Sequence, residues 1–222
     1  MPYILNIETA TKNCSVAIAK DGQTLICSEI AEQGYSHAEK LHVFIEEVLQ
    51  RSGVSFTDLS AIAVSQGPGS YTGLRIGVSA AKGLCYALGI PLIAVDTLQI
   101  LAAQVTIDSG LIVPMLDARR MEVYSAIFDT NHHKTRPTEA QIITSESFID
   151  CKETLYFVGD GAQKCRPLLT RDNFVFLDEI VYPSAREMSA LGYEKFKKND
   201  TVDVAYFEPN YLKDFMIAQK GS

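Results

Sequence analysis

The sequence lacks the patterns of disulfide-bonded, zinc-binding and membrane-spanning proteins. Its five cysteines are widely spaced and include no C-x-x-C pair, so neither a disulfide framework nor a structural zinc site is indicated. No apolar run approaches the roughly 20 residues that a membrane-crossing helix needs. Residues 1–5 enter a strand pattern without a charged leader. We therefore expect a cytoplasmic protein with reduced thiols.

Positive charge is also scarce. The 222 residues include 20 basic and 27 acidic side chains, which gives a net charge of −7. Capture of nucleic acid by this chain alone is not favoured, because phosphate neutralisation needs a concentrated basic face. The only dense basic group is Lys195, Lys197 and Lys198, which is typical of a solvated helix end. A hydrophobic content of 47% is that of an ordinary globular chain.

Several catalytic motifs are missing. There is no G-x-x-x-x-G-K-[ST] segment, so a P-loop ATPase is excluded. Ser70 does not stand in a G-x-S-x-G pattern, and a serine hydrolase is therefore not indicated. His37 and His42 are five residues apart on an expected helix, whereas metal ligands on one helix face are three or four apart. We expect no metal site.

The most informative stretch is residues 65–77, where an apolar strand pattern breaks into a glycine-rich loop and becomes helical. Gly67, Pro68 and Gly69 interrupt regular structure. Ser70 can cap the helix that follows at residues 71–88, whose first turn leaves backbone N–H groups free. Such a helix end favours an anion or a closely docked partner.

Small residues recur every four positions along this helix, at Gly73, Gly77, Ala81 and Cys85. A glycine inside a helix costs about 1 kcal/mol relative to alanine, so two of them require a reason. The strip can pack closely on the protein's own sheet, or it can contact a helix of another molecule. Spacing alone does not decide between these interpretations.

Hydrophobic periodicity and turn residues predict a repeated arrangement of strands and helices. The expected strands are residues 3–8, 14–19, 23–29, 61–64, 92–95, 111–116, 121–128, 155–158 and 174–177, and the expected helices are residues 36–51, 71–88, 97–105 and 184–198, with a short helix from residue 162. A hairpin is followed by helix and strand units in both halves. This order predicts an α/β protein of two related domains, residues 1–106 and 107–222, each a mixed sheet flanked by helices.

Four segments carry a resemblance to a known family: residues 8–11 (ETAT), 37–41 (HAEKL), 67–77 (GPGSYTGLRIG) and 117–119 (DAR). In this order they resemble the TsaB (YeaZ) family of bacteria. The resemblance implies an actin-like ATPase (ASKHA, ribonuclease H-like) fold. It also implies a degenerate relative of TsaD, the subunit that transfers a threonylcarbamoyl group to the adenosine following the anticodon of tRNA.

The function implied by the resemblance is that of a non-catalytic subunit. It would pair with a TsaD-like subunit, be joined by a TsaE-like ATPase, and meet tRNA only through the complex. Partner binding would use the helices at residues 36–51 and 71–88, and the same surface could form a homodimer. The implied partner-binding residues are His37, Leu41, Phe44, Ile45, Tyr71, Gly73, Leu74, Gly77, Ala81 and Cys85.

The nucleotide and metal sites of TsaD are altered here. Thr97 and Leu101 stand where the resemblance places the metal-binding histidines of TsaD, and leucine cannot ligate a metal. Residues 117–120 (DARR) replace its glycine-rich nucleotide turn. No cofactor is firmly implied, although weak or vestigial binding of ATP or ADP stays open. The candidate phosphate contacts are Thr9, Thr11, Gly69, Ser70 and Arg119.

The alternative interpretation is an enzyme, an actin-like ATPase or small-molecule kinase that keeps its own nucleotide site. The hydroxyl groups of the expected turn at residues 8–11 could hydrogen-bond an anion. The Glu8 carboxylate in the same turn opposes this, because a negative group beside an anion is unfavourable without a cation. Binding of ATP and magnesium to the isolated chain separates the two interpretations.

Overall fold

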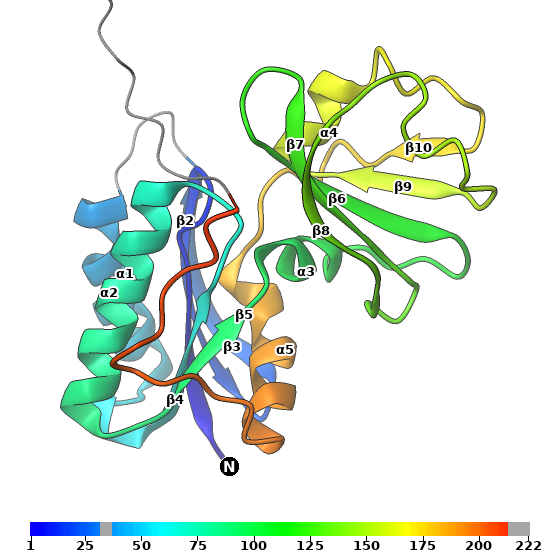
Figure 1. Cartoon of the computed structure of the whole chain (residues 1–222). Coiled ribbons are helices and arrows are strands. Elements are labelled where there is room, and N and C mark those ends of the chain that lie inside the picture. The colour runs from blue at the N-terminus through cyan, green and yellow to red at the C-terminus, as the bar shows by residue number, and fades with distance from the viewer. Residues whose placement is uncertain (32–36, 213–222) are drawn as a thin grey trace, which may run out of the picture.

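The computed structural model describes residues 1–31 and 37–212, so the predicted helix cap at Ser36 lies outside the described residues. Two five-stranded sheets stand side by side, in the orders β3-β2-β1-β4-β5 and β10-β9-β6-β7-β8 (Figure 1). The first sheet contains β1 (Tyr3–Glu8), β2 (Asn13–Lys20), β3 (Gln23–Ala31), β4 (Leu59–Ser65) and β5 (Leu92–Val95). The second contains β6 (Leu111–Asp117), β7 (Glu122–Phe128), β8 (Lys134–Ile142), β9 (Leu155–Val158) and β10 (Phe174–Phe176).

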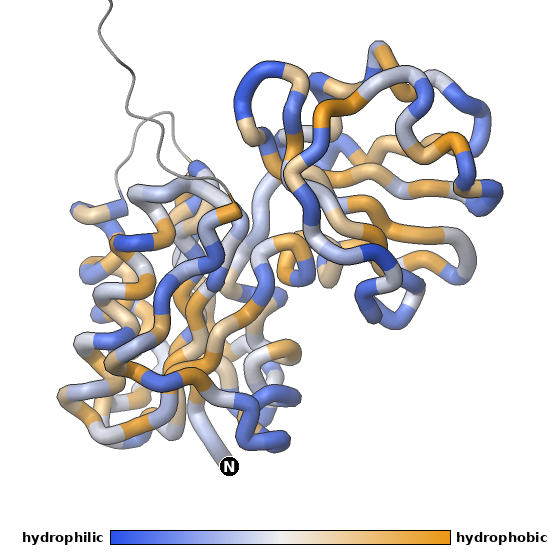
Figure 2. Tube along the Cα trace, in the orientation of Figure 1, coloured by the Kyte–Doolittle hydropathy of each residue, from blue (hydrophilic) through white to orange (hydrophobic). Residues whose placement is uncertain are grey.

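The first sheet is covered on both faces. The helices α1 (His37–Ser52) and α2 (Tyr71–Leu88) lie side by side on one face, and α5 (Ala185–Lys197) lies on the other (Figure 1). A short 3-10 helix, η1 (Phe56–Asp58), leads into β4. Hydrophobic residues predominate in the central strands of this sheet (Figure 2), and residues 61–65 of β4 are fully buried, as expected for a parallel strand with both faces covered.

The second sheet packs against α3 (Thr97–Ala102) and α4 (Asp160–Cys165). The buried side chains of Leu98, Leu101 and Phe128 join α3 to the strands. The predicted mixed sheets flanked by helices are therefore confirmed. The strand β8 was not predicted, because its residues are all exposed or half-exposed and include Pro137. It pairs only with β7 at the edge of the sheet.

The helix α5 returns the chain from the second sheet to the first. Met188 is fully buried against Ile4, Ala61 and Ile93, because these side chains form an apolar face of the first sheet that α1 and α2 leave uncovered. The division into residues 1–106 and 107–222 stays a prediction, and α5, which that division assigns to the second unit, packs on the first sheet. Among the described residues, no helix is both long and apolar enough to span a membrane.

Candidate functional site

The turn between β1 and β2 lies against the start of α2. The Thr9 hydroxyl donates to the Gly73 carbonyl oxygen at 2.8 Å, and the Ser70 amide donates to the Ala10 carbonyl oxygen at 2.6 Å. The Ser70 hydroxyl in turn accepts from the Gly73 amide at 3.3 Å, which confirms the predicted helix cap. The first two bonds therefore hold the turn against the helix end.

Glycine is required along α2 because the turn approaches the helix backbone so closely. A Cβ built at Gly69 would lie closer than 3.0 Å to the Ala10 carbonyl oxygen. A Cβ at Gly73 would lie closer than 3.0 Å to the Thr9 carbonyl oxygen, and a Cβ at Gly77 would lie closer than 3.0 Å to the Thr9 hydroxyl oxygen. The first half of the small-residue strip is thus packed within the chain, which accounts for both helix glycines.

Most of the predicted partner-binding residues are buried inside this chain. Phe44 and Tyr71 are half-buried, and Tyr71 packs on Tyr211 with ring centroids 4.8 Å apart. His37 Nε2 lies 2.7 Å from the Thr11 carbonyl oxygen and must donate to it, because a carbonyl only accepts. Partner contact through these helices stays a prediction that has to use other side chains. The predicted partner-binding residues that are buried are His37, Leu41, Ile45, Gly73, Leu74, Gly77, Ala81 and Cys85.

The outward face of the helix pair carries exposed apolar side chains that the sequence-based prediction omitted. Val43 of α1 is 56% exposed and Tyr86 of α2 is 86% exposed. Ile76 and Leu84 of α2 are half-buried and pack against the core of the first sheet. Tyr86 could have been found from the sequence, since it directly follows Cys85 of the buried strip and so points to another face of the helix.

The segment after α5 runs along α2 without regular structure. Val202 forms a bridge with Leu92 of the edge strand β5. The Lys82 ammonium donates to the carbonyl oxygens of Ala205 and Phe207, each at 3.0 Å. This segment therefore borders the exposed face of α2 and reduces the area of α2 that a partner could contact.

Glu8 lies at the base of the first turn and is completely buried. One carboxylate oxygen accepts from the Ala10 amide at 2.6 Å. Burial raises the pKa of Glu8 to about 7, while the hydrogen bond from the Ala10 amide acts in the opposite direction. A proton on this carboxyl would relieve the cost of burying a charge beside the turn.

The predicted phosphate contacts are divided between the two sheets. Thr9, Thr11, Gly69 and Ser70 gather at the first turn, whereas Arg119 is exposed on the turn between β6 and β7. The Thr9 hydroxyl and the Ser70 amide already donate within the chain. Phosphate binding at these residues stays a prediction, and it would have to displace those bonds.

The turn between β6 and β7 uses its own amides. The Asp117 amide donates to the Asp160 carboxylate at 2.9 Å, and the Arg119 amide donates to the Asp117 carboxylate at 2.8 Å. Between them, the Ala118 amide donates to the Glu122 carbonyl oxygen at 3.1 Å. Three successive N–H groups that could cradle an anion are thereby occupied.

Lys164 of α4 completes this turn. Its ammonium group donates to the carbonyl oxygens of Arg120 at 2.8 Å and Glu122 at 2.7 Å, and it pairs with the Asp117 carboxylate. Burial raises the pKa of Asp160, and Lys12 of the first turn is among the charges that lower it. Sequence reasoning missed Asp160 and Lys164, because neither belongs to a motif and the fold alone brings them to the turn.

The positions compared with metal ligands have structural roles here. The Thr97 hydroxyl is buried and accepts from the Gly67 amide at 3.2 Å. Leu101 is fully buried in the core beneath the second sheet. Within residues 1–31 and 37–212, no group of three or more His, Cys, Asp or Glu side chains is placed to hold a metal ion.

Comparison with known proteins agrees with this architecture. The chain is 33% identical over 226 residues to the tRNA threonylcarbamoyladenosine biosynthesis protein TsaB of Escherichia coli, a match that covers 98% of this chain and 97% of that protein. Identity to TsaB of Bacillus subtilis is 30% over 219 residues, with 95% and 93% covered. The solved structure of YeaZ from Pseudomonas aeruginosa is 26% identical with a TM-score of 0.81, covering 96% of this chain and all 100% of that one.

A family model described as TsaD, tRNA N6-adenosine threonylcarbamoyltransferase, matches residues 26–217. The two mixed sheets with their flanking helices have the actin-like ATPase fold. The nearly full-length matches are to TsaB proteins, and they group the chain with TsaB rather than with the transferase itself. The chain belongs to the TsaB (YeaZ) family of tRNA threonylcarbamoyladenosine biosynthesis proteins.

Proposed function

We propose that this chain is a non-catalytic subunit in the formation of threonylcarbamoyladenosine next to the anticodon of tRNA. It docks on a TsaD-type transferase in the cytoplasm and activates it, and a TsaE-type ATPase joins the pair. The observation that carries the proposal is that the Thr9 hydroxyl, the Ser70 amide and the amides of residues 117–119 already donate within the chain. An enzyme of this fold would instead direct such groups toward the phosphates of a nucleotide.

The docking surface is the outward face of α1 and α2. Val43 and Tyr86 expose apolar area there, and buried aromatic side chains contribute strongly to protein interfaces. Two copies of this chain can also meet through the same face, because a two-fold interface uses one patch twice. The net charge of −7 favours contact with tRNA only through the complex.

Val43→Lys and Tyr86→Ala are each expected to weaken association with the cognate TsaD-type subunit by about tenfold or more, because each removes apolar contact area. Calorimetric titration of the purified subunits measures the effect. Formation of the modified adenosine, with the TsaE-type ATPase, ATP and tRNA present, should fall in parallel.

Leu25→Lys is the matched control. Leu25 lies on β3, away from the helix pair, and is 44% exposed, so this variant should bind the TsaD-type subunit as the parent does. Unchanged association of both helix variants, with thermal unfolding unaltered, would refute the assignment of the docking face. Sedimentation of the isolated chain shows whether the same variants also disrupt a homodimer.

The rival function, an ATPase or small-molecule kinase, is tested on the isolated chain. Titration with ATP and magnesium is expected to give no saturable binding in the micromolar range, because the donors of both turns are occupied by Gly73, Ala10, Asp160, Asp117 and Glu122. Micromolar binding accompanied by release of phosphate would establish the enzyme instead.

A further inference from the structure

Glu8, at the base of the turn between β1 and β2, has one carboxylate oxygen without a hydrogen-bond partner. The side chain is completely buried, and its Oε1 accepts from the Ala10 amide at 2.6 Å. Its Oε2 reaches no partner in the described part of the chain. No ion pair found within residues 1–31 and 37–212 includes Glu8. A charge on this carboxyl would therefore be buried without a counter-charge, which is unfavourable.

Ser65, at the end of β4, provides the acceptor for a proton on Glu8. The pairing of β1 with β4 is parallel and matches Ile7 with Val64. Glu8 and Ser65 follow these residues and are therefore neighbours on one face of the sheet. The Ser65 hydroxyl oxygen is also buried and has no hydrogen-bond partner among the described residues. A protonated Glu8 Oε2 is a donor, so one proton satisfies both atoms and removes the buried charge.

The turn that begins after Glu8 holds the start of α2. The Ala10 amide donates to Glu8, and the carbonyl oxygen of the same residue accepts from the Ser70 amide at 2.6 Å. The Thr9 hydroxyl donates to the Gly73 carbonyl oxygen at 2.8 Å. A displacement of the turn at Glu8 is therefore transmitted to the first turn of α2 through two direct hydrogen bonds.

The same turn holds the start of α1. His37 is buried, and its Nε2 donates to the Thr11 carbonyl oxygen across 2.7 Å. The Thr11 hydroxyl accepts from the Asn13 amide at 3.3 Å, where β2 begins. Residues 9–11 therefore connect Glu8 with the first turns of both helices that carry the proposed docking face.

The groups packed around Glu8 differ in how they titrate. On β2, burial raises the pKa of the Cys14 thiol to about 11, and the Glu8 charge adds to this effect. On β4 and in the turn, the neighbours are the Ser65 hydroxyl and backbone amides, which do not titrate near neutral pH. Burial raises the pKa of Glu8 itself to about 7. Glu8 therefore changes charge near neutral pH, whereas the Cys14 thiol stays protonated there.

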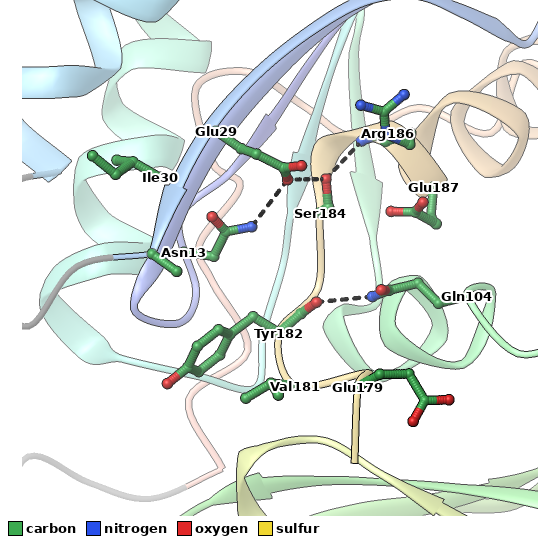
Figure 3. Close-up of a pocket in the computed structure, with 11 residues that line it drawn as sticks. Asn13, Glu29, Ile30, Gln104, Glu179, Val181, Tyr182, Ser184, Arg186 and Glu187 are labelled. Atoms are coloured by element: carbon green, nitrogen blue, oxygen red, sulfur yellow. Dashed lines mark hydrogen bonds between the residues drawn. The ribbon is translucent and has the colours of Figure 1, made fainter. Parts of the chain in front are cut away.

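Charged groups close to this region have to be separated from Glu8 in any measurement. Lys12 is exposed at the end of the turn, and its charge acts on Asp160 of the second unit. Figure 3 shows Glu29 and Glu187 around the start of α5. Burial raises the pKa of Asp160 and of Glu187. All of these groups are retained when Glu8 alone is replaced, so their titration cancels in the comparison of the two proteins.

We infer that Glu8 acts as a proton switch on the starts of α1 and α2. With a neutral carboxyl, residues 9–11 hold both helices. When the proton leaves Oε2 for solvent, the carboxylate needs more donors than the Ala10 amide supplies, so water enters and the turn loosens. The outward face of the two helices is then less ordered, and the TsaD-type subunit binds more weakly. This last step rests on the proposed function, whereas the switch within the chain does not.

Nuclear magnetic resonance of the isotope-labelled full chain from pH 5 to pH 8 tests the switch. The side-chain carboxyl carbon of Glu8 is expected to titrate with a midpoint of about 7. Protection of the Ser70 and Gly73 amides from hydrogen exchange, corrected for intrinsic pH dependence, should fall about fivefold or more with the same midpoint. Absence of this midpoint at Glu8, or constant protection of both amides while Glu8 titrates, would overturn the inference.

Glu8→Gln keeps an acceptor for the Ala10 amide but cannot ionise, so the two amides should keep the same protection at every pH. His37 is still present in this variant. Glu146→Gln is the matched control, because it removes a carboxylate from an exposed site in the second unit and should behave as the parent does. A pH dependence that persists in Glu8→Gln would assign the switch to another group, such as His37, and would also overturn the inference.

Calorimetric titration with the cognate TsaD-type subunit at pH 6 and pH 8 tests the effect on docking. Relative to Glu8→Gln, the parent and Glu146→Gln should bind about fivefold more weakly at the higher pH. The same ratio for all three proteins would overturn the link from the switch to docking. No association at either pH would instead refute the proposed function, and the resonance measurements on the free chain would still decide the switch.

Discussion

Gly73→Ala is expected to destabilise the folded chain by about 1–3 kcal/mol or more, the usual range for forcing extra volume into a packed site. The added Cβ would lie closer than 3.0 Å to the Thr9 carbonyl oxygen. That oxygen belongs to a backbone turn, and the Thr9 hydroxyl and the Ala10 carbonyl hold this turn to α2. The turn cannot yield as a flexible side chain would. Urea unfolding followed by circular dichroism measures the loss.

Gly83→Ala is the matched control on the same helix. A Cβ at Gly83 meets nothing within 4 Å, so the substitution should stabilise the protein by up to about 1 kcal/mol through helix propensity alone. The opposite signs of the two substitutions isolate the close approach of the turn. Equal stability of the two variants would show that the first turn does not pack against α2.

Local signals predicted the central unit of the fold. The Ser70 cap, the helix at residues 71–88 and the hairpin at Asp21-Gly22 are all confirmed. Gly89, which follows that helix, takes the left-handed conformation of a C-cap. These features depend on residues a few positions apart, so the sequence carries them directly.

Features that depend on contacts between residues far apart in the sequence were harder to predict. In β8, both faces carry exposed or half-exposed residues, so no alternation of apolar and polar positions marks the strand. The helix α5 was predicted with its cap at Ser184, which accepts from the Arg186 amide. Its packing partner was not predictable, because an apolar stripe does not say which sheet it covers.

The same limit applies to the site. The spacing of Gly73 and Gly77 indicated a close approach of backbone to this helix, but the approaching group is Thr9, which is bonded to Gly73 across 64 positions of sequence. A partner helix and a turn of the same chain leave the same pattern of small residues. Only the fold distinguishes them. In the fold the strip is buried, whereas Val43 and Tyr86 are exposed.

Glu8→Gln is expected to alter how stability depends on pH. The pKa of Glu8 is raised from 4.5 to about 7 in the folded chain, so folding favours the protonated carboxyl. Its stabilising contribution is complete below pH 4.5 and is lost as the pH rises through about 7. At about 1.4 kcal/mol per pKa unit, a rise of about 2.5 units corresponds to a loss of about 3.5 kcal/mol. Glutamine stays neutral, so the variant should not suffer it.

The free energy of unfolding, measured by urea titration from pH 5 to pH 8, tests this expectation. The variant should gain on the parent from pH 5 to about pH 7 and level off above it, because the parent must then bury an ionised Glu8 while the glutamine can keep accepting from the Ala10 amide as Glu8 does. Asp160 and Glu187 also have raised pKa values. They are present in both proteins, however, and cancel in the difference. A difference that does not change with pH would mean that Glu8 is ionised in the fold, and that the hydrogen bond from the Ala10 amide, rather than a proton, compensates its burial.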